Sequence, residues 1–384
     1  MKICVINNLY EPFARGGTER VIENIIFGLK EKKHEVFIIT TKPYSKNKPK
    51  NKDLDIYYIN SCYFNLNKIP KILRLFWHFL NLFNLSSYFK IRHILKKEKP
   101  DLVMTHNLEG VGFLTPFAIK KQKIKHIHTL HDMQLLHPSG LMMHGKEKLF
   151  DNWHSKIYQK INKYLFGLVD AVISPSNWLL KEHKNRKFFR KSKKIIAPNP
   201  VKLCIDKIKK KNTFSETNIL YVGQIGKYKG IDLLVEVINN CANKNNINLA
   251  IVGTGNEEED LRKKIKDNKS INFLGQKTKK EVEKLMLSAD FLVVPSICYE
   301  NSPTVIYEAA IVGLPVIASR IGGITELVHS LGGILFNPED KNDLGNKIIW
   351  AIKNPFNLEK IGDRSKKNIK NFRLDNYINL VLRD

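Results

Sequence analysis

The residues whose types and spacing suit chemistry gather between Pro295 and Gly313, in the stretch PSICYENSPTVIYEAAIVG. The triplet Asn301-Ser302-Pro303 is typical of a helix start, because Asn and Ser are favoured N-cap residues and proline is favoured at the first helical position. The backbone N–H groups of Thr304 and Val305 would then point outward at the positive end of the helix dipole. That arrangement favours an anion such as a phosphate.

Two carboxylates flank this expected anion site. Glu308 lies one turn after Thr304 on the same helical face, and Glu300 lies in the loop just before the helix. Carboxylates do not bind phosphate, but they accept hydrogen bonds from neighbouring hydroxyl groups. The combination suits a ligand with a phosphate in the middle and a sugar on each side. Taken alone, the stretch is equally compatible with a solvated loop charge and a surface helix residue.

Two glycine-rich loops could contribute to a similar ligand site. The loop in YVGQIGKYKG (221–230) ends a strand pattern and places Lys227 and Lys229 beside a helix start, where a lysine can neutralise a diphosphate. In the first half, Gly16 and Gly17 follow a strand pattern and precede a helix, and paired glycines allow a ligand to approach the backbone closely. Each loop is weak evidence alone, since such residues also serve solvation and turns.

Short apolar runs rich in β-branched residues alternate with amphipathic helix patterns along the chain, for example helices at 18–32 and 257–266. This alternation predicts an α/β fold with parallel sheets covered by helices on both faces. The expected strands lie at 3–6, 36–40, 56–59, 102–105, 126–130 and 171–174 in the first half, and at 219–222, 249–252, 271–274, 291–294, 316–318 and 334–336 in the second.

A polar, basic break at 206–215 separates two such α/β series. We therefore predict a first domain at 1–205, a linker at 206–217 and a second domain at 218–367. Both domains are expected to be Rossmann-like and doubly wound, and to face each other across a cleft where a ligand binds.

The composition excludes several classes of protein. With 384 residues, 43% of them apolar, the chain can form two packed cores, so disorder and fibrous structure are excluded as its main character. The five cysteines are scattered and include no C-x-x-C pair, which argues against a disulfide framework or a zinc ribbon and indicates a reducing, cytoplasmic compartment. The apolar segment at the N-terminus is too short for a signal peptide. The most apolar run, 72–85, is interrupted by polar residues and shorter than the roughly 20 residues of a membrane span.

The net charge of +27 is concentrated in one half of the chain. Residues 1–205 contain 37 Lys and Arg against 15 Asp and Glu, whereas residues 206–384 contain 27 against 22. Such a basic half suits an anionic membrane or nucleic acid. Two segments combine basic and aromatic residues as a membrane interface requires: 68–97, and 181–194 with Phe188 and Phe189 at its centre. The alternative is a solvated face beside an ordinary buried helix. We do not expect nucleic-acid binding, because the known RNA- and DNA-binding signatures are missing.

A series of motifs follows in a fixed order along nearly the entire chain: GGTERVIENIIFGL, THN (105–107), TLHD (129–132), APNPV (197–201), YVGQIGKYKG, IVGTGNEEEDL, NFLGQ and ENSPTVIYEAAIVGLPVIASRIGGITELV. The series resembles glycosyltransferase family 4, whose members are retaining, nucleotide-sugar-dependent enzymes with the two-domain GT-B fold. The two glutamates eight residues apart are the most specific of these motifs. The resemblance also implies that a last helix, at about 368–384, packs back on the first domain.

The resemblance implies roles for individual residues. Three would be catalytic: Lys229 neutralises the leaving diphosphate, Glu300 contacts the hydroxyls of the donor sugar, and His131 approaches the transferred sugar. Glu308 would hold the ribose hydroxyls. The other implied donor-binding residues are Gly16 and Gly17 in a closing loop, Gln224, Lys277 near the base, and Asn301, Ser302, Pro303, Thr304 and Val305 near the sugar and diphosphate.

The sequence departs from the family pattern at one charged position. The family usually pairs its lysine with an arginine just after the strand-ending glycine, and here that position is Gln224, which brings no charge. Lys227 is a possible substitute. The departure leaves open a nucleotide-sugar-binding protein without transferase activity. A second departure, the triplet 301–303 in place of a Gly- and Phe-rich loop, leaves the expected helix start intact.

Together these features predict a hexosyltransferase that moves a hexose-type sugar from a nucleotide diphosphate sugar to a glycan or lipid-linked oligosaccharide. The expected setting is cell-surface polysaccharide biosynthesis (lipopolysaccharide, capsule or exopolysaccharide). The resemblance implies no cofactor and no metal. The histidines at 126, 128, 131, 137 and 144 also lack the spacing and the Cys or Glu partners of a zinc site. We expect a cytoplasmic protein, peripheral on the inner face of the membrane through its basic first domain. The alternatives are a basic membrane- or nucleic-acid-binding protein, and an enzyme of the same fold that releases sugar.

Overall fold

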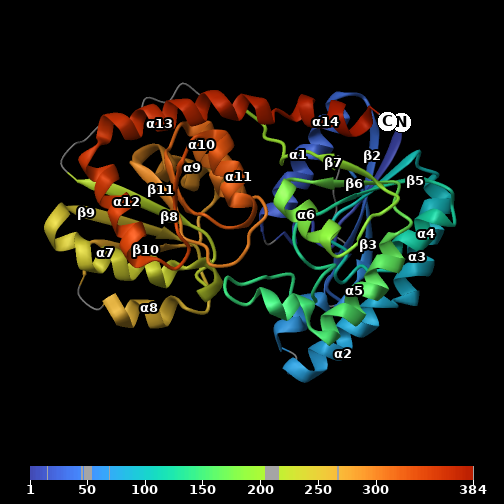
Figure 1. Cartoon of the computed structure of the whole chain (residues 1–384). Coiled ribbons are helices and arrows are strands. Elements are labelled where there is room, and N and C mark those ends of the chain that lie inside the picture. Colours follow the sequence, from blue (N-terminus) through green and yellow to red (C-terminus); the bar gives the residue numbers. More distant parts are fainter. Residues whose placement is uncertain are drawn as a thin grey trace. The chain divides into compact units, whose positions relative to one another are not determined.

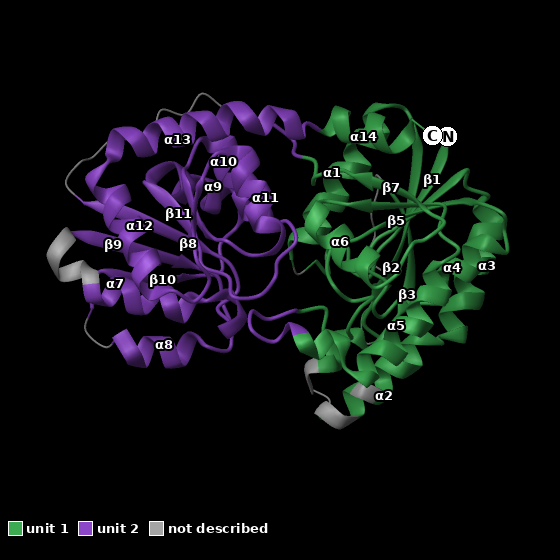
Figure 2. Cartoon of the chain, viewed as in Figure 1, with its two compact units in different colours: residues 1–141, 148–200, 374–384 green, residues 142–147, 201–373 purple. Residues whose placement is uncertain are grey.

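A computed structural model describes residues 1–14, 16–44, 46, 54–68, 70–203, 216–265 and 268–383. The chain divides into two compact units (Figure 2). Unit 1 contains residues 1–141, 148–200 and 374–384, and unit 2 contains residues 142–147 and 201–373. Each unit is an α/β structure with its own parallel sheet and its own core.

Unit 1 is built on a seven-stranded parallel sheet with the order β3-β2-β1-β4-β5-β6-β7 (Figure 1). Its strands are β1 (Lys2–Ile6), β2 (Glu35–Lys42), β3 (Asp55–Asn60), β4 (Leu102–Thr105), β5 (Lys125–Thr129), β6 (Ala171–Ser174) and β7 (Lys193–Ile196). The helical segments are α1 (Gly17–Glu31), η1 (Cys62–Lys68), α2 (Lys71–Leu82), α3 (Leu85–Glu98), α4 (Thr115–Lys120), η2 (Glu147–Asp151), α5 (Trp153–Phe166), α6 (Asn177–Asn185) and α14 (Leu374–Leu382). Because the strand order reverses beside β1, the sheet is doubly wound.

Unit 2 is built on a six-stranded parallel sheet with the order β10-β9-β8-β11-β12-β13. Its strands are β8 (Thr217–Val222), β9 (Ile247–Val252), β10 (Ile271–Gly275), β11 (Phe291–Val294), β12 (Val316–Ser319) and β13 (Ile334–Phe336). The helical segments are η3 (Lys227–Lys229), α7 (Ile231–Asn245), α8 (Glu258–Ile265), α9 (Lys279–Ser288), α10 (Thr304–Val312), α11 (Gly322–Leu331), α12 (Lys341–Lys353), α13 (Pro355–Asn368) and η4 (Ile369–Phe372). The order reverses between β8 and β11, which marks the end of the sheet where ligands usually bind.

The expected strands agree with the structure because burial on both faces of a parallel sheet selects continuous apolar runs. All twelve predicted strands are present. In β11, for example, all four residues are buried, and two separate apolar clusters cover the two faces of the unit 2 sheet. Strand β7 was not predicted, because its sequence KKII has only two apolar residues and it pairs only with β6 among the described strands.

The last helix lies on α1, within unit 1. The two helices approach closely at Gly28, where a Cβ atom would lie 2.6 Å from Leu374 Cγ. The helix is shorter than expected, since α13 and η4 both belong to unit 2 and the chain returns to unit 1 only at Leu374. The predicted first domain also differs from unit 1, because the segment Met142–Glu147 and the residues after Pro200 are part of unit 2.

Most of the predicted linker, up to residue 215, lies outside the described residues, while Thr217 already begins β8. Across the part of the chain that the structure describes, we find no helix with the length and apolar character that crossing a membrane requires.

Candidate functional site

The two residues with the strongest expected roles meet in unit 2, although they are 71 positions apart in the sequence. Lys229 lies in η3, after β8, and Glu300 lies in the loop after β11. The Lys229 Nζ atom donates to Glu300 Oε2 over 2.8 Å. Because β8 and β11 are neighbours and parallel, their carboxyl ends bring both loops to the same edge of the sheet. The sequence singled out both residues separately, and the topology brings them into contact.

The two loops are joined by main-chain contacts. The backbone N–H groups of Ile297 and Cys298 both donate to the carbonyl of Tyr228 over 3.1 Å. The Ser296 hydroxyl donates to the second carboxylate oxygen of Glu300. Both oxygens of Glu300 are therefore held by side chains of these loops, which fixes the carboxylate at the sheet edge. Ser296 was missed in the sequence analysis, because its only signal was its place just after the strand.

A small cavity of about 30 Å³ opens beside this pair. Its walls come from the ends of β8 and β11, their loops and the start of α10, and the lining residues are Tyr221, Val222, Gly223, Lys229, Val293, Val294, Ser296, Glu300, Pro303 and Val305. A cavity of this size holds a water-sized group with polar partners. It brings an ammonium group, a carboxylate and a helix start together around one small space.

The electrostatics of the pair favour its charged form. Burial lowers the pKa of Lys229, but the attraction of the Glu300 carboxylate outweighs this effect and holds the pKa above its usual value. The ammonium group is therefore charged at neutral pH. Burial raises the pKa of the neighbouring Cys298 thiol to about 12, so this cysteine stays a neutral thiol.

The start of α10 differs in detail from the prediction. The N-cap residue is Pro303 rather than Asn301 or Ser302, and the first helical residue is Thr304. Pro303 makes no side-chain cap bond to the helix, and the Ser302 hydroxyl is hydrogen-bonded to the hydroxyl of Tyr307. The first amide groups of a helix have no intrahelical partner, so an uncapped start leaves donors for an anion. The anion site at the start of α10 stays a prediction, and the predicted cap by Asn301 or Ser302 is wrong.

Three other residues of unit 2 with predicted roles in donor binding lie on α10 and in the loops after β8 and β10. Glu308 is half-buried on α10, one turn after Thr304. Gln224 is exposed, and its side-chain oxygen accepts a hydrogen bond from the Tyr228 hydroxyl. Lys277 follows β10, and its Nζ atom lies 3.8 Å from Glu281 Oε1.

The remaining predicted residues belong to unit 1. Gly16 is the N-cap residue of α1, its N–H donates to Glu19 Oε2 over 2.8 Å, and Gly17 is the first residue of that helix. His131 follows β5, and its Nε2 atom lies 2.8 Å from Nδ1 of His106. The roles that the resemblance assigns to these three residues stay predictions.

Comparisons with known proteins show which family the chain resembles. The family model described as "Glycosyltransferase Family 4" matches residues 15–203, and the one described as "Glycosyl transferases group 1" matches residues 205–370. A 41.2 kDa protein of the cps region of Klebsiella pneumoniae is 30% identical over 277 residues, which are 68% of this chain and 72% of that protein. The chain belongs to glycosyltransferase family 4.

Other relatives of this glycosyltransferase extend over almost its full length. It is similar to a 42.6 kDa protein of the cps region of Klebsiella pneumoniae, with 28% identity over 96% of this chain and 95% of that protein. Its structure is similar to that of HepE of Anabaena, solved in complex with UDP-glucose, with a TM-score of 0.72, 16% identity and coverage of 100% of this chain and 98% of that one. Together with the two doubly wound sheets, this likeness establishes the GT-B fold.

A second polar cluster lies in unit 1 of the transferase and was only partly predicted. Asp132, in the TLHD motif, accepts a hydrogen bond from the Gln134 N–H over 2.8 Å. Burial raises the pKa of Asp132 to about 7, and Glu109 adds to this effect. A carboxyl group with such a pKa can both accept and donate a proton near neutral pH. Its only sequence signal was its place beside His131.

The histidines that the sequence analysis judged unsuited to zinc have other partners in the structure. His126 Nε2 and His128 Nδ1 lie 2.7 Å and 2.9 Å from the hydroxyl of Thr105, and His131 pairs with His106. Within the described residues, no group of three or more His, Cys, Asp or Glu side chains could hold a metal ion. Two members of the series, His126 and His128, are therefore buried polar residues of unit 1, whereas His144 is 41% exposed and lies 2.8 Å from Glu339.

These buried histidines predict a loss of stability in mild acid. His106, His126, His128 and His183 are at most 2% exposed, and burial lowers the pKa of all four, to about 3 for His126 and about 4 for His183. Between pH 6.5 and 5.5 the unfolded chain binds protons that the folded chain excludes, which costs about 1 kcal/mol for each histidine. Asp132 opposes this by about 1 kcal/mol, because the folded state protonates it first.

These four histidines and Asp132 together should cost about 3 kcal/mol over this interval, and His131, whose pKa burial lowers to about 4, should add to the loss; the measurement is the free energy of unfolding in urea at the two pH values. In the variant Asp132→Asn the opposing effect is removed, so the loss with falling pH should become steeper. A free energy of unfolding that is the same at both pH values would contradict the assignment of neutral buried histidines.

Proposed function

We propose that this glycosyltransferase is a retaining hexosyltransferase that uses a nucleotide diphosphate sugar and needs no metal. The observation that carries the proposal is the contact between Lys229 and Glu300 beside the uncapped start of α10. A cation and a row of amide donors suit the diphosphate, while a carboxylate suits the sugar hydroxyls. Within one small site these groups match both parts of such a donor.

The reaction would proceed by stabilising the departing diphosphate. As the bond from the sugar to the phosphate oxygen breaks, negative charge develops on the leaving group. Lys229 and the amides of Thr304 and Val305 would hold that charge. The acceptor hydroxyl bonds to the sugar carbon on the face that the nucleotide leaves, and its proton passes to the leaving phosphate oxygen. Glu300 would orient the sugar and Glu308 the ribose.

We further propose a role in cell-surface polysaccharide assembly, with a glycan or lipid-linked oligosaccharide as acceptor. The support comes from relatives in two cps regions, one of them 28% identical over almost the whole chain. The solved neighbour with bound UDP-glucose makes a uridine nucleotide the first donor to test. Such acceptors are presented at the inner face of the cytoplasmic membrane, where this chain would act as a peripheral protein.

Donor binding can be measured as a shift in thermal stability against UDP-sugars, other nucleotide sugars and free nucleotides. A ligand that binds only the folded state adds about 2.7 kcal/mol at 100 times its Kd. We expect a shift with one donor, unchanged by EDTA. Glu308→Gln should reduce the shift, because the amide is a poorer acceptor for two ribose hydroxyls.

The matched control is Glu359→Gln, which makes the same change at an exposed position of α13 and should bind the donor normally. Equal shifts in the wild type and Glu308→Gln would remove Glu308 from the site. If none of the nucleotides stabilised the wild type, the proposed donor class would be wrong, and a shift that EDTA abolishes would contradict the metal-independent proposal.

A further inference from the structure

An apolar surface lies exposed on unit 1, on α2, α3 and the turn between them. Its side chains are between 43% and 61% exposed: Leu73, Phe76, Phe79, Leu80, Phe83, Leu85 and Phe89. We refer to these seven residues as the α2–α3 apolar surface. Exposed single apolar residues are common, but seven on two consecutive helices and their turn, four of them phenylalanines and two of these (Phe79 and Phe83) in ring contact, usually mark an interaction site.

The helical pattern of α2 shows that this exposure is systematic. Leu73, Phe76, Leu80 and Phe83 follow a spacing of three, four and three residues, so they lie along one side of the helix. The opposite side is buried in unit 1, since Asn81 and Leu82 are 5% and 3% exposed. A surface helix normally turns polar residues to water. Here the outward side of α2 is apolar, and packing within unit 1 does not account for these apolar residues.

The sequence around this surface is strongly basic, although one carboxylate also meets α2, since His78 Nδ1 lies 3.1 Å from Glu109 Oε1. Residues 56–97 contain no Asp or Glu and seven basic residues: Lys68, Lys71, Arg74, Lys90, Arg92, Lys96 and Lys97. Lys90 and Arg92 are exposed on α3, directly after Phe89. Basic residues beside inserted aromatic rings are the pattern of a helix that binds an anionic lipid surface.

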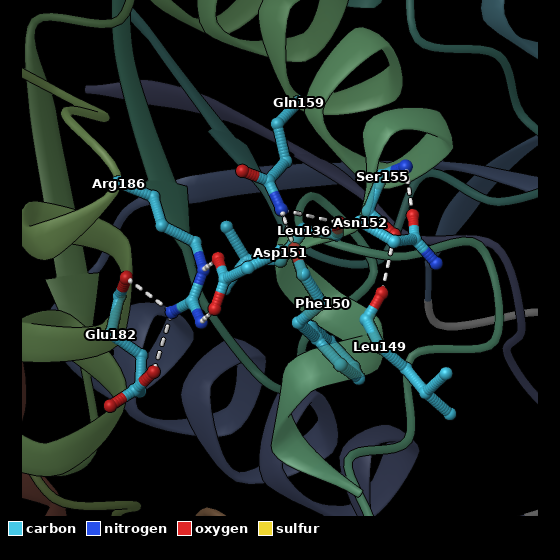
Figure 3. Close-up of polar contacts among 9 residues, drawn as sticks. All are labelled: Leu136, Leu149, Phe150, Asp151, Asn152, Ser155, Gln159, Glu182 and Arg186. Atoms are coloured by element: carbon cyan, nitrogen blue, oxygen red, sulfur yellow. Dashed lines mark hydrogen bonds and ion pairs between the residues drawn. The ribbon is translucent and has the colours of Figure 1, made fainter.

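The other basic segment considered above, 181–194, has a different structure. Phe188 and Phe189 are 2% and 3% exposed, so the prediction that these rings meet a membrane is wrong. Figure 3 shows that Arg186 reaches Asp151 with two hydrogen bonds of 3.0 Å and also contacts Glu182. These rings fill the core of unit 1, and part of the positive charge is neutralised within the unit.

We propose that the α2–α3 apolar surface docks on an anionic phospholipid bilayer, with its phenylalanine rings at the level of the acyl chains and its basic residues on the headgroups. The biological purpose of this docking rests on the proposed function, because the enzyme would meet a lipid-linked acceptor at the bilayer. The docking itself needs no donor. A second copy of the chain is a poor occupant, because two such surfaces would bring the exposed Lys90 and Arg92 of each copy together, and like charges repel.

The test is flotation of the full chain with two kinds of vesicle, phosphatidylcholine alone and phosphatidylcholine with phosphatidylglycerol, at low and high salt. We expect binding to the anionic vesicles only, weaker but still measurable at high salt. The variant F76S/F79S should bind roughly tenfold more weakly or worse, because two exposed rings lose their transfer from water. The control W350S/F356S removes two exposed aromatic residues from unit 2, 38% and 74% exposed, and should bind as the wild type does.

Several results would overturn the proposal. One is a wild type that fails to float with anionic vesicles; another is equal binding by the wild type and F76S/F79S. A wild-type dimer in light scattering that F76S/F79S makes monomeric, without lipid binding, would assign the surface to self-association. The thermal shift with donor, which F76S/F79S should retain, separates a failure of docking from a failure of the proposed transferase function.

Discussion

Replacing Lys229 with alanine is expected to lower kcat by about 10²–10³-fold, the usual effect of removing one group that stabilises charge in the transition state. Its Nζ atom is held 2.8 Å from Glu300 Oε2 and stays charged at neutral pH, so it is preorganised before any donor arrives. Because the proposed leaving group gains charge as the bond to the sugar breaks, the loss should appear mainly in kcat rather than in KM.

The matched control is Lys227→Ala, two positions earlier in the same short helical turn. Lys227 is exposed, and no ion pair with it is present among the described residues, so its loss changes the local charge equally without removing a group from the cavity. We expect less than a threefold change for this control, measured as initial rates with saturating donor. Similar rates for Lys229→Ala and the wild type would exclude Lys229 from catalysis. A large loss in Lys227→Ala would instead show that it replaces the charge missing at Gln224.

The sheets and the core of the site could be predicted because their signals are local. Each buried strand is a short apolar run, and Glu300 and Glu308 stand in one continuous motif. Strand β7 and the cap of α10 could not be predicted in the same way. Two lysines occupy half of β7, and whether Ser302 caps a helix or bonds to Tyr307 depends on a side chain a turn away. Such choices among local hydrogen bonds are decided by packing.

The segments that combine aromatic and basic residues also show what the sequence alone does not predict, namely which aromatic rings are buried. Phe188 and Phe76 both stand in segments that combine basic and aromatic residues, yet the first is 2% exposed and the second 61%. Composition gave both segments as possible membrane contacts. Only the three-dimensional structure distinguishes a ring that packs against His183 from one on the outward side of α2. The excess of basic residues therefore indicated that a membrane contact would lie in the first half of the chain, but it did not indicate which surface of that half would make the contact.

Gly230→Ala is expected to destabilise the protein by about 4 kcal/mol or more. Losses of this size are exceptional, and we expect one here because the backbone around Gly230 cannot move to accommodate a side chain. Gly230 has φ of +65°, a left-handed conformation that costs other residues roughly 1–2 kcal/mol. In addition, a Cβ atom there would lie 2.0 Å from the carbonyl oxygen of Pro295. That oxygen belongs to the backbone at the end of β11 and cannot rotate away, so the two loops must separate.

The control Gly275→Ala separates the cost of the left-handed backbone conformation from the cost of the clash with Pro295. Gly275 has nearly the same φ, +69°, but a Cβ atom there would meet no atom within 4 Å. We expect this variant to lose only about 1–2 kcal/mol, measured for both variants as the free energy of unfolding in urea. Equal losses would mean that the contact with Pro295 is unimportant.

The steric difference matters for the site because Gly230 directly follows Lys229 and Pro295 directly precedes Ser296. Loops forced apart at this point would also draw the ammonium group away from Glu300, so Gly230→Ala should weaken the donor-induced thermal shift as well, whereas Gly275→Ala should retain it.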